Sequence, residues 1–291
     1  GNSENEDSFT YYANDGETTS NIGTIKVKVA SKSTEQRLIS KTYPKSGSQK
    51  FTNGRQYAYD LAQSHVGSIL LAGLNGNSPN EAGYIVKIDS QNSNQILTKN
   101  YDFTSNTDFF NSIDDTEDGG FILSGFSDHK ALLLKVNSEG QQEWYKRFGG
   151  DGNNNGQRAI ELNDGSFLFA ISLHNTDNSW SLYIIKTDSN GEEIWSNKIS
   201  IGGENQYYWS VYPRGILETN DGYIIGSNGN LVNSPGSERG AVLTKIDFNG
   251  NLVLNKIVED WGELESIVPT SSGFVGTGFT GSRPIIFKID E

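Results

Sequence analysis

Apolar residues along this chain come in short runs of about five to seven positions, separated by turns rich in Gly, Asn and Asp. The clearest unit is DGGFILSGFSDHKALLLKVNSEGQQEWYKRFGG at residues 118–150, with apolar runs at 121–125, 132–136 and 142–148. In the turn NSEG, the glycine supplies the positive φ that closes a hairpin. No repeat carries an apolar stripe with the 3.6-residue period of a helix. The pattern therefore predicts antiparallel β-sheets.

The same turn returns as DSNG and DFNG, and each copy follows an apolar run that ends in lysine. Lysines of this kind recur 43 to 59 residues apart, at Lys87, Lys135, Lys186, Lys245 and Lys288. A period of roughly 40 to 50 residues with four strands per unit is typical of a β-propeller blade. We expect each lysine to pack its aliphatic stem at a strand end and to bond its ammonium to turn oxygens.

Complete copies of the unit occupy residues 55–103, 107–150, 153–203 and 205–260. The segment RLISKTY at 37–43 resembles only a fourth strand, whereas the last copy, 261–291, has three strands. Together these fragments make one more blade. We predict an all-β fold over residues 36–291: a five-bladed β-propeller of four-stranded antiparallel blades, closed by an N-terminal outer strand. Six blades are the alternative, with a hairpin at residues 9–29 supplying most of the sixth.

Residues 1–35 form a separate region, predicted to be an acidic tether at 2–7 followed by a β-hairpin. Two alternating runs, 9–12 and 24–29, flank the turn at 14–16. The segment DSFTYYANDGETTSNIGTIKVKVAS resembles the closing strands of bacterial cadherin-like repeats. It is too short to form an immunoglobulin-like sandwich by itself.

The repeat itself resembles uncharacterised β-propeller repeats of secreted bacterial proteins, common in Bacteroidetes. DGGFI at 118–122, DGYI at 221–224, KTD at 186–188 and Trp195 carry the resemblance. The first copy departs from it, with Leu97 near the tryptophan position. The resemblance implies an extracellular or cell-surface protein and brings no activity with it. The acidic start also resembles the tether of Bacteroidetes surface lipoproteins, which raises a lipid anchor as an expectation, although their lipidated cysteine is missing here.

The composition narrows the classes of partner. Cysteine is absent, so neither disulfides nor thiolate metal sites are available. The net charge of −13 argues against nucleic acids and anionic membranes as partners, and no apolar run is long enough to span a membrane. We expect a monomer without a cofactor. Scattered Ca²⁺ sites in acidic turns, such as Asp114-Asp115, are the alternative to simple solvation of those charges.

Two groups of aromatic residues differ in their predicted role. Trp144 and Trp195 occupy equivalent outer-strand positions, which indicates packing between blades. The loops 74–83, 172–181 and 227–240 are long, polar and unlike one another, and function concentrates in such loops on a repeat scaffold. Candidate ligand-binding residues near that face are Phe109, Phe110, Asp128, His129, His174, Trp180, Tyr207, Tyr208, Trp209 and Trp261.

The leading hypothesis is a non-catalytic propeller, secreted or on the cell surface, that binds a glycan or protein through this long-loop face. A glycoside hydrolase or lyase is the second hypothesis, with carboxylates such as Asp60 and Glu265 in the central funnel. A structural spacer is the third. No HExxH, Walker or GxSxG pattern is present, and His129 with His174 leaves a two-histidine zinc site as a minor alternative.

Overall fold

The chain divides into two compact units, Gly1–Thr42 and Tyr43–Glu291. The computed structural model describes the following residues: 5–11, 23–29, 55–77, 80–90, 95–150, 152–177, 179–199, 208–231, 238–260, 262–271, 273–280 and 283–289.

The smaller unit contains one antiparallel pair of strands, β1 (Asn5–Tyr11) and β2 (Gly23–Val29). Their register runs without a shift from Asn5 opposite Val29 to Tyr11 opposite Gly23. The two alternating runs therefore pair with each other, and β1 begins inside the segment that we expected to be a tether. The turn at 14–16 lies outside the described residues, and so does the segment 37–43 that we predicted as an outer strand.

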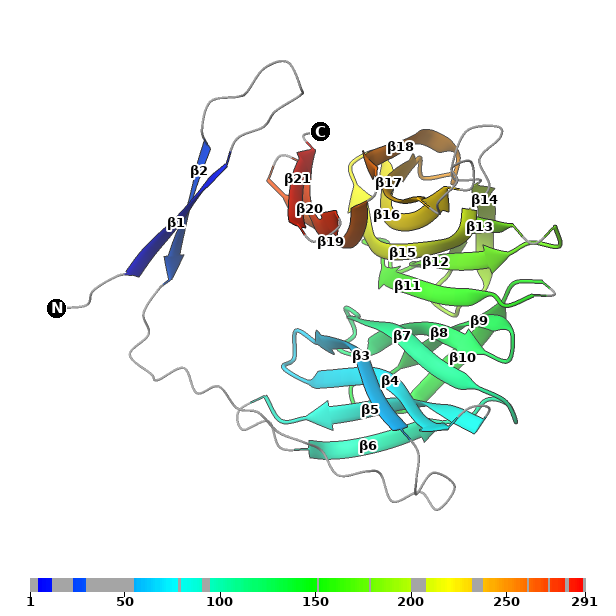
Figure 1. Ribbon diagram of the computed structural model, residues 1–291. Coiled ribbons are helices and arrows are strands. Elements are labelled where there is room, and N and C mark those ends of the chain that lie inside the picture. Colours follow the sequence, from blue (N-terminus) through cyan, green and yellow to red (C-terminus); the bar gives the residue numbers. More distant parts are fainter. Residues whose placement is uncertain are drawn as a thin grey trace. The chain divides into compact units, whose positions relative to one another are not determined.

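The larger unit is a series of antiparallel sheets that follow one another in chain order (Figure 1). Four sheets have four strands each, and the fifth has three among the described residues. The first holds β3 (Arg55–Gln63), β4 (Ile69–Asn77), β5 (Asn80–Ile88) and β6 (Gln95–Tyr101). The second holds β7 (Asp108–Asp115), β8 (Phe121–Ser127), β9 (Lys130–Val136) and β10 (Gln142–Phe148). The third holds β11 (Asn155–Glu161), β12 (Phe167–His174), β13 (Trp180–Thr187) and β14 (Glu193–Ile199). The fourth holds β15 (Tyr208–Thr219), β16 (Gly222–Leu231), β17 (Glu238–Ile246) and β18 (Leu252–Asp260), and the fifth β19 (Gly262–Thr270), β20 (Gly273–Thr280) and β21 (Arg283–Ile289).

Repeated β-propeller-like sheets are thus present, as the sequence predicted. The third and fourth sheets are also joined to each other through one residue pair, Trp180 and Tyr208. Every element of the described residues is a strand. None of the described segments forms a helix with the length and apolar character of a membrane span.

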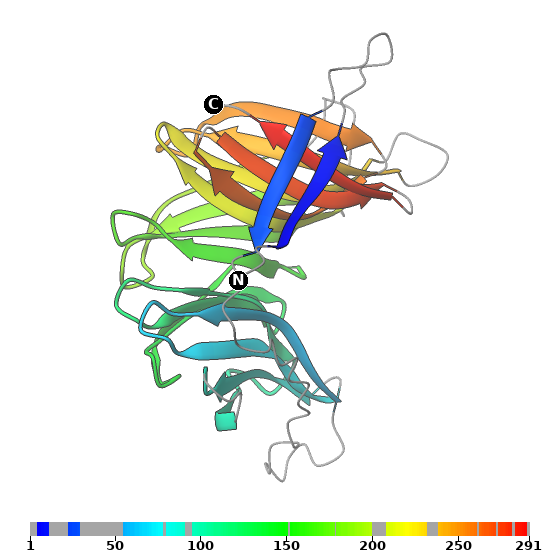
Figure 2. The same cartoon turned by 90° about the vertical axis from the view of Figure 1, so that its left-hand side faces the viewer.

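The first strand of each sheet lies on the inside of the series. β3 contacts β7, β7 contacts β11, β11 contacts β15 and β15 contacts β19. In Figure 1 the sheets follow one another in chain order, and in Figure 2 the fourth and fifth sheets lie together above the first two. Four apolar clusters fill the spaces between consecutive sheets. The larger unit is therefore held together by sheet-on-sheet packing rather than by one central core.

This packing explains why the apolar runs are continuous rather than alternating. Successive residues of a strand point to opposite faces of its sheet. In β8, Phe121 and Leu123 pack towards the first sheet, whereas Ile122 packs towards the third. All three side chains are fully buried. A sheet covered on both faces needs apolar residues at every position of its middle strands.

Strand-one-to-two turns and strand-three-to-four turns lie at the same end of each sheet, which we call the turn end. Here Lys135 Nζ donates to Asp118 Oδ2 at 2.7 Å, and equivalent pairs join Lys186 to Asp164 and Lys245 to Asp221 at 2.8 and 2.9 Å. These contacts confirm the structural role predicted for three of the five lysines, and Lys87 donates instead to Glu139 in a turn of the next sheet at 2.7 Å. In these three sheets the acceptor is the aspartate of the strand-one-to-two turn.

Trp144 and Trp195 also lie near the turn end, and each packs on the next sheet. The Trp144 ring covers Gly191 and its Nε1 donates to the carbonyl oxygen of Ser189 at 3.1 Å. The Trp195 ring covers Gly250 in the same way. A side chain on either glycine would collide with the indole. The predicted packing of these tryptophans between blades is confirmed.

At the opposite end, which we call the loop end, lie the loops between strands two and three and the connections between sheets. The start of β3 lies there, because Arg55 pairs with Gly76 near the end of β4. The loops are shorter than expected. Most of 74–83 belongs to β4 and β5, and the β8–β9 connection is only Asp128 and His129.

Candidate functional site

The first strand of every sheet carries a β-bulge at an equivalent place. Each register shift leaves one residue without a partner on the second strand. We call these five residues the bulge ring: Tyr59, Asn111, Gln157, Arg214 and Glu265. Each stands eight positions before a positive-φ turn glycine, respectively Gly67, Gly119, Gly165, Gly222 and Gly273. The bulge is therefore part of the repeat.

Glycines on the second strand allow the backbone to close around several of these bulges. A Cβ atom on Gly73, Gly125 or Gly278 would overlap the carbonyl oxygen of the residue two positions before the bulge. Only glycine lets the two strands approach this closely. In these three sheets the close approach of the strands thus depends on a glycine outside the bulge ring, and the ring residues differ in type from sheet to sheet.

All five members of the bulge ring line one cavity of about 420 Å³ (the central cavity). Its remaining lining comes from Asp60, Arg158, Pro213 and Ser266. The bulges lie in the first half of their strands in most sheets, so the cavity is nearer the loop end than the turn end. Five sheets each contribute one polar residue of a different type to a shared space.

Two of the charged groups in the central cavity satisfy each other. Arg158 Nη1 donates to Asp60 Oδ2 at 2.5 Å. The same oxygen accepts the backbone N–H of Ile113 at 3.2 Å, and Asp60 Oδ1 accepts the N–H of Leu61 at 3.0 Å. Asp60 therefore anchors the first sheet to the second and third.

Asp114 belongs to the same charged cluster. Burial raises the pKa of Asp114 to about 6, and the negative charges of Asp115 and Asp60 act in the same direction while Arg158 opposes them. A carboxyl group that titrates near pH 6 is either a functional group or a pH-dependent cost to stability.

Arg214 has a different environment from Arg158. Its guanidinium carbon lies 5.8 Å from the centre of the Tyr212 ring. Among the described residues, its buried Nε has no acceptor, and no carboxylate forms an ion pair with it. The central cavity thus holds one neutralised arginine and one whose charge is uncompensated by the described side chains.

Several predicted ligand-binding residues lie together at the loop end of the second and third sheets. The rings of Phe109 and Phe126 stack with centroids 5.3 Å apart, and His129 meets the edge of Phe126 at 6.2 Å. Asp128 and His129 both have positive φ, 44° and 67°, in a two-residue hairpin turn. Asn106 Nδ2 donates to Asp128 Oδ1 at 2.6 Å, which holds the turn in place.

His174 and Trp180 continue this surface on the third sheet. They face each other across the β12–β13 hairpin with ring centroids 4.8 Å apart. The buried side chain of Asn154 joins both parts, since its Nδ2 donates to the His129 carbonyl and its Oδ1 accepts the His174 N–H at 3.2 Å. We call the five predicted residues of this surface the loop patch: Phe109, Asp128, His129, His174 and Trp180.

The remaining predicted residues do not join the loop patch. Phe110 is a correction, because it is fully buried between the first and second sheets against Tyr101. Neighbours on a strand face opposite ways, so only Phe109 reaches the surface. Tyr207 and Trp261 lie outside the described residues, as do the side chains of Tyr208 and Trp209 on β15.

The sequence hypotheses about carboxylates and metals have different outcomes. Asp60 and Glu265, suggested for the central funnel, both line the central cavity. His129 and His174 are joined through Asn154. Within the part of the chain that the structure describes, no three His, Asp or Glu side chains come together as metal ligands would.

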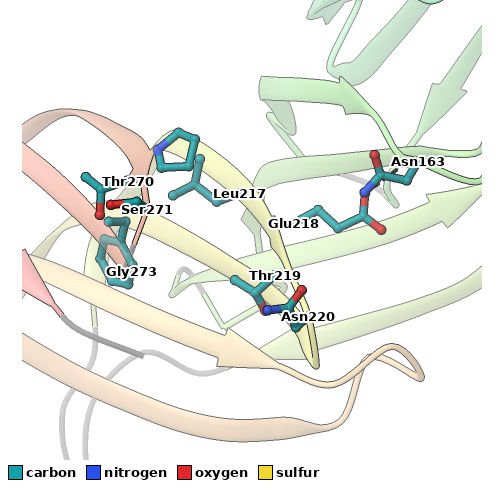
Figure 3. A pocket seen from close by; sticks show the side chains of 10 residues that line it. Asn163, Leu217, Glu218, Thr219, Asn220, Thr270, Ser271 and Gly273 are labelled. Carbon is teal, nitrogen blue, oxygen red and sulfur yellow. Dashed lines mark hydrogen bonds between the residues drawn. The ribbon is translucent and has the colours of Figure 1, made fainter.

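A second cavity of about 230 Å³ lies at the turn end, between the fourth and fifth sheets (Figure 3). Glu161 and Glu218 occupy equivalent positions and accept a backbone N–H from the preceding sheet's turn, Glu117 and Asn163, at 2.6 and 2.8 Å. On the fifth sheet Pro269 stands at that position and has no side-chain acceptor. The second cavity is therefore a gap in a repeated packing contact.

Comparisons with known proteins leave the function open. No protein-family model matches this sequence, and no curated protein is significantly similar to it. A protein of unknown function from Bacteroides caccae is similar in structure at 14% identity, with 75% of this chain and 89% of that chain covered and a TM-score of 0.38. A Lactobacillus plantarum protein is similar at 11% identity, with 81% of each chain covered and a TM-score of 0.46.

Glutaminyl cyclase from Myxococcus xanthus is similar at 11% identity, with 80% of this chain and 91% of that chain covered and a TM-score of 0.38. None of these TM-scores reaches 0.5, so the fold rests on the strand pairing described above. The resemblances to Bacteroidetes repeats and to cadherin-like hairpins stay predictions.

Proposed function

We propose that this chain is a non-catalytic binding module of the β-propeller type, secreted or on the cell surface, which takes a glycan or protein ligand at its loop end. The observation that carries the proposal is the bulge ring. One register shift recurs at an equivalent place in all five sheets, and the residue that it leaves unpaired is of a different type each time. Varied polar groups around one concave space are what ligand recognition requires.

The loop patch also favours the loop end as the binding face. It offers aromatic rings beside histidine and aspartate side chains, a combination that suits sugars and peptides alike. The extracellular location rests on the resemblance of the repeat to secreted bacterial proteins. A purely structural role as a spacer does not explain why five different polar residues surround one cavity.

The test of this function is a glycan array and a panel of peptides probed with the parent protein, Gln157→Ala and Glu265→Ala. Asn249→Ala, an exposed change at the turn end, is the matched control. We expect ligands of the parent to bind the control equally and the two ring variants at least several-fold more weakly. Equal binding of all four proteins would place the site elsewhere.

Catalysis is the second candidate function, because both carboxylates suggested by the sequence line the central cavity. Asp60 is held by Arg158 and two backbone N–H groups, which leaves Glu265 as the more accessible of the two. Each glycan that binds is therefore incubated with the protein and analysed for cleavage. Turnover that Glu265→Gln abolishes would establish the hydrolase or lyase in place of the binding module.

The binding proposal includes a closed ring of five blades, and the burial of two repeated positions supports closure. The residue two places after each bulge packs on the preceding sheet: Ile113, Ala159, Ile216 and Ile267 are 3, 1, 6 and 6% exposed. The equivalent Leu61 on the first sheet is 61% exposed. Its apolar side chain lacks the neighbour that every other copy has.

The fifth sheet shows the complementary gap. The residue two places before each repeated lysine packs towards the following sheet: Ile85, Leu133, Ile184 and Leu243 are 0, 0, 0 and 4% exposed. The equivalent Ile286 is 71% exposed. In a closed ring Leu61 would pack against the fifth sheet near Ile286, which would bury both residues. The segment 37–43 would then add the fourth strand beside β21.

A pair of engineered cysteines tests closure without interference, since the chain has none of its own. We expect Leu61→Cys with Ile286→Cys to form an intramolecular disulfide under mild oxidation, detected by peptide mass spectrometry. Leu133→Cys with Ala159→Cys is the positive control, from an interface described above. A disulfide in the control pair alone would contradict the five-bladed ring and favour six blades, and a crosslinked dimer would mean exchange between two copies.

A further inference from the structure

We propose that the central cavity binds an acidic sugar, with the guanidinium of Arg214 on the carboxylate and the ring of Tyr59 against the sugar face. This inference rests on the proposed function and narrows its ligand to one chemical class. It begins from the charges in the central cavity.

Arg214 supplies a cation that the described residues do not neutralise. The other arginine of the central cavity, Arg158, is paired with Asp60. Arg214 contacts the Tyr212 ring, and its buried Nε has no acceptor among the described residues. A buried donor without an acceptor is unfavourable, and a ligand that supplies the acceptor removes that cost. A carboxylate matches the planar fork of the guanidinium with two parallel hydrogen bonds.

The surroundings of Arg214 indicate a ligand that also carries hydroxyl groups. Gln157 offers both a donor and an acceptor, Ser266 a hydroxyl and Glu265 an exposed carboxylate acceptor. Asn111 is already engaged, because its Nδ2 donates to Asn155 Oδ1 and to the Gly156 carbonyl at 2.6 and 2.8 Å. The groups that remain can bond several ring hydroxyls at once.

An exposed aromatic surface stands on the first sheet of the same cavity. Tyr59 lines the central cavity and is 51% exposed. Tyr57 stacks parallel to it, with centroids 6.1 Å apart and 7° between the ring planes. A flat, rigid ring pair presents a face for the apolar side of a sugar ring. The volume of about 420 Å³ lies within the range of small-ligand pockets.

The overall charge makes a specific site necessary for such a ligand. With a net charge of −13 the molecule repels anions in general. Binding of an acidic sugar therefore depends on a cation inside the cavity, because the net charge of the whole molecule does not attract it. An acidic peptide could also place a carboxylate on Arg214, but it would leave Glu265 facing further carboxylates, so the sugar is favoured.

The experiment compares an oligosaccharide of neutral sugars that carries one hexuronate residue with its methyl ester, in which a methyl group replaces the negative charge of that one carboxyl group. Binding is measured by calorimetry on the full chain, its Arg214→Met variant and a Lys256→Met control that removes the same charge from an exposed site. We expect the hexuronate to bind the parent and the control equally, and the Arg214→Met variant at least tenfold more weakly. The methyl ester should bind all three proteins weakly and alike.

Melting temperatures show whether each variant folds. If Arg214→Met is unfolded, Arg214→Lys replaces it, and an intermediate loss is expected because lysine keeps the charge without the fork. Neutral and acidic sugars that bind equally, without dependence on Arg214, would overturn the inference and leave the binding module intact. An acidic peptide that binds through Arg214 where no sugar binds would overturn the sugar assignment. The absence of any saccharide or peptide ligand would overturn both proposals.

Discussion

The turn end and the bulge ring are two repeated regions of the same strands, and they repeat in opposite ways. At the turn end the residues themselves recur: an aspartate, a positive-φ glycine and a lysine make the same contacts in the second, third and fourth sheets. In the bulge ring only the register shift recurs, and Tyr, Asn, Gln, Arg and Glu take the same position. We infer from this difference that the turn-end residues stabilise the fold, whereas the bulge-ring residues can vary and are the ones proposed to bind a ligand.

The largest effect should come from the backbone of the bulge. Gly125→Ala should lower the free energy of unfolding by about 3 kcal/mol or more, because its Cβ would overlap the Phe109 carbonyl oxygen of the paired strand. Gly150→Ala is the control, with open space around its Cβ position, and it should change stability by about 0.5 kcal/mol or less. Urea denaturation measures both. Equal stability of the two variants would mean that the bulge tolerates a wider strand separation.

The scaffold role of the turn end is tested next. Trp195→Ala should cost about 3 kcal/mol, the lower end for a truncated tryptophan, since the indole is partly exposed over Gly250. Ile194→Ala, one residue away on the exposed face of β14, should cost far less. Ligand affinity should be unchanged in both. A large loss of affinity in a folded Trp195→Ala protein would break the separation between scaffold and recognition.

The charged cluster beside the bulge ring should show as a pH dependence. Burial raises the pKa of Asp114 from 3.8 to about 6, so the folded state keeps a proton that the unfolded chain has already lost. Stability therefore falls as the pH rises from about 4 to about 6 and stays lower above that range, by about 2 to 3 kcal/mol. Asp114→Asn should abolish this fall. The same decline between pH 4 and pH 7.5 in parent and variant would show that another group is responsible.

The smallest effect on stability should come from a ring side chain itself. Gln157→Ala removes an amide that makes no described hydrogen bond within the protein, so stability should change by about 0.5 kcal/mol or less. Affinity for the ligand should fall by about 1 kcal/mol or more, since a hydrogen bond to the ligand is lost. Thermal melts and calorimetry measure the two quantities. A large loss of stability would assign Gln157 to the scaffold instead.

Much of the fold could be predicted because it depends on short-range signals. The repeated lysines and turn glycines located the four complete sheets; β8 and β10 begin at the apolar runs expected for them, and β9 begins two residues before its run. Loop lengths were overestimated for 74–83. Its Gly and Asn residues are typical of loops, yet most of them continue β4 and β5, where pairing satisfies their backbone groups.

The bulge ring was missed for a physical reason. A bulge is a property of the pairing between two strands, and no one residue type marks all five: the second strand has a glycine at this position in three sheets but Ile171 and Ser227 in the other two. The usable signal was spacing. In all five copies the residue eight positions before the turn glycine is the bulge-ring residue. The error at Phe110 has a simpler cause. Phe109 and Phe110 were both predicted to lie on the surface, but neighbouring residues of a strand face opposite sides, so only Phe109 does.

The bulge ring also bears on how such a protein changes over generations. Duplication of one repeat unit copies the turn glycine, the lysine and the bulge together, so a new sheet arrives already able to fold. On the proposed function, a single later substitution at the bulge would change what the molecule recognises, since the bulge residue has no paired residue on the second strand. The codons for the turn glycine and the lysine would therefore keep the fold, while the codon for the bulge residue would be the one that changes recognition.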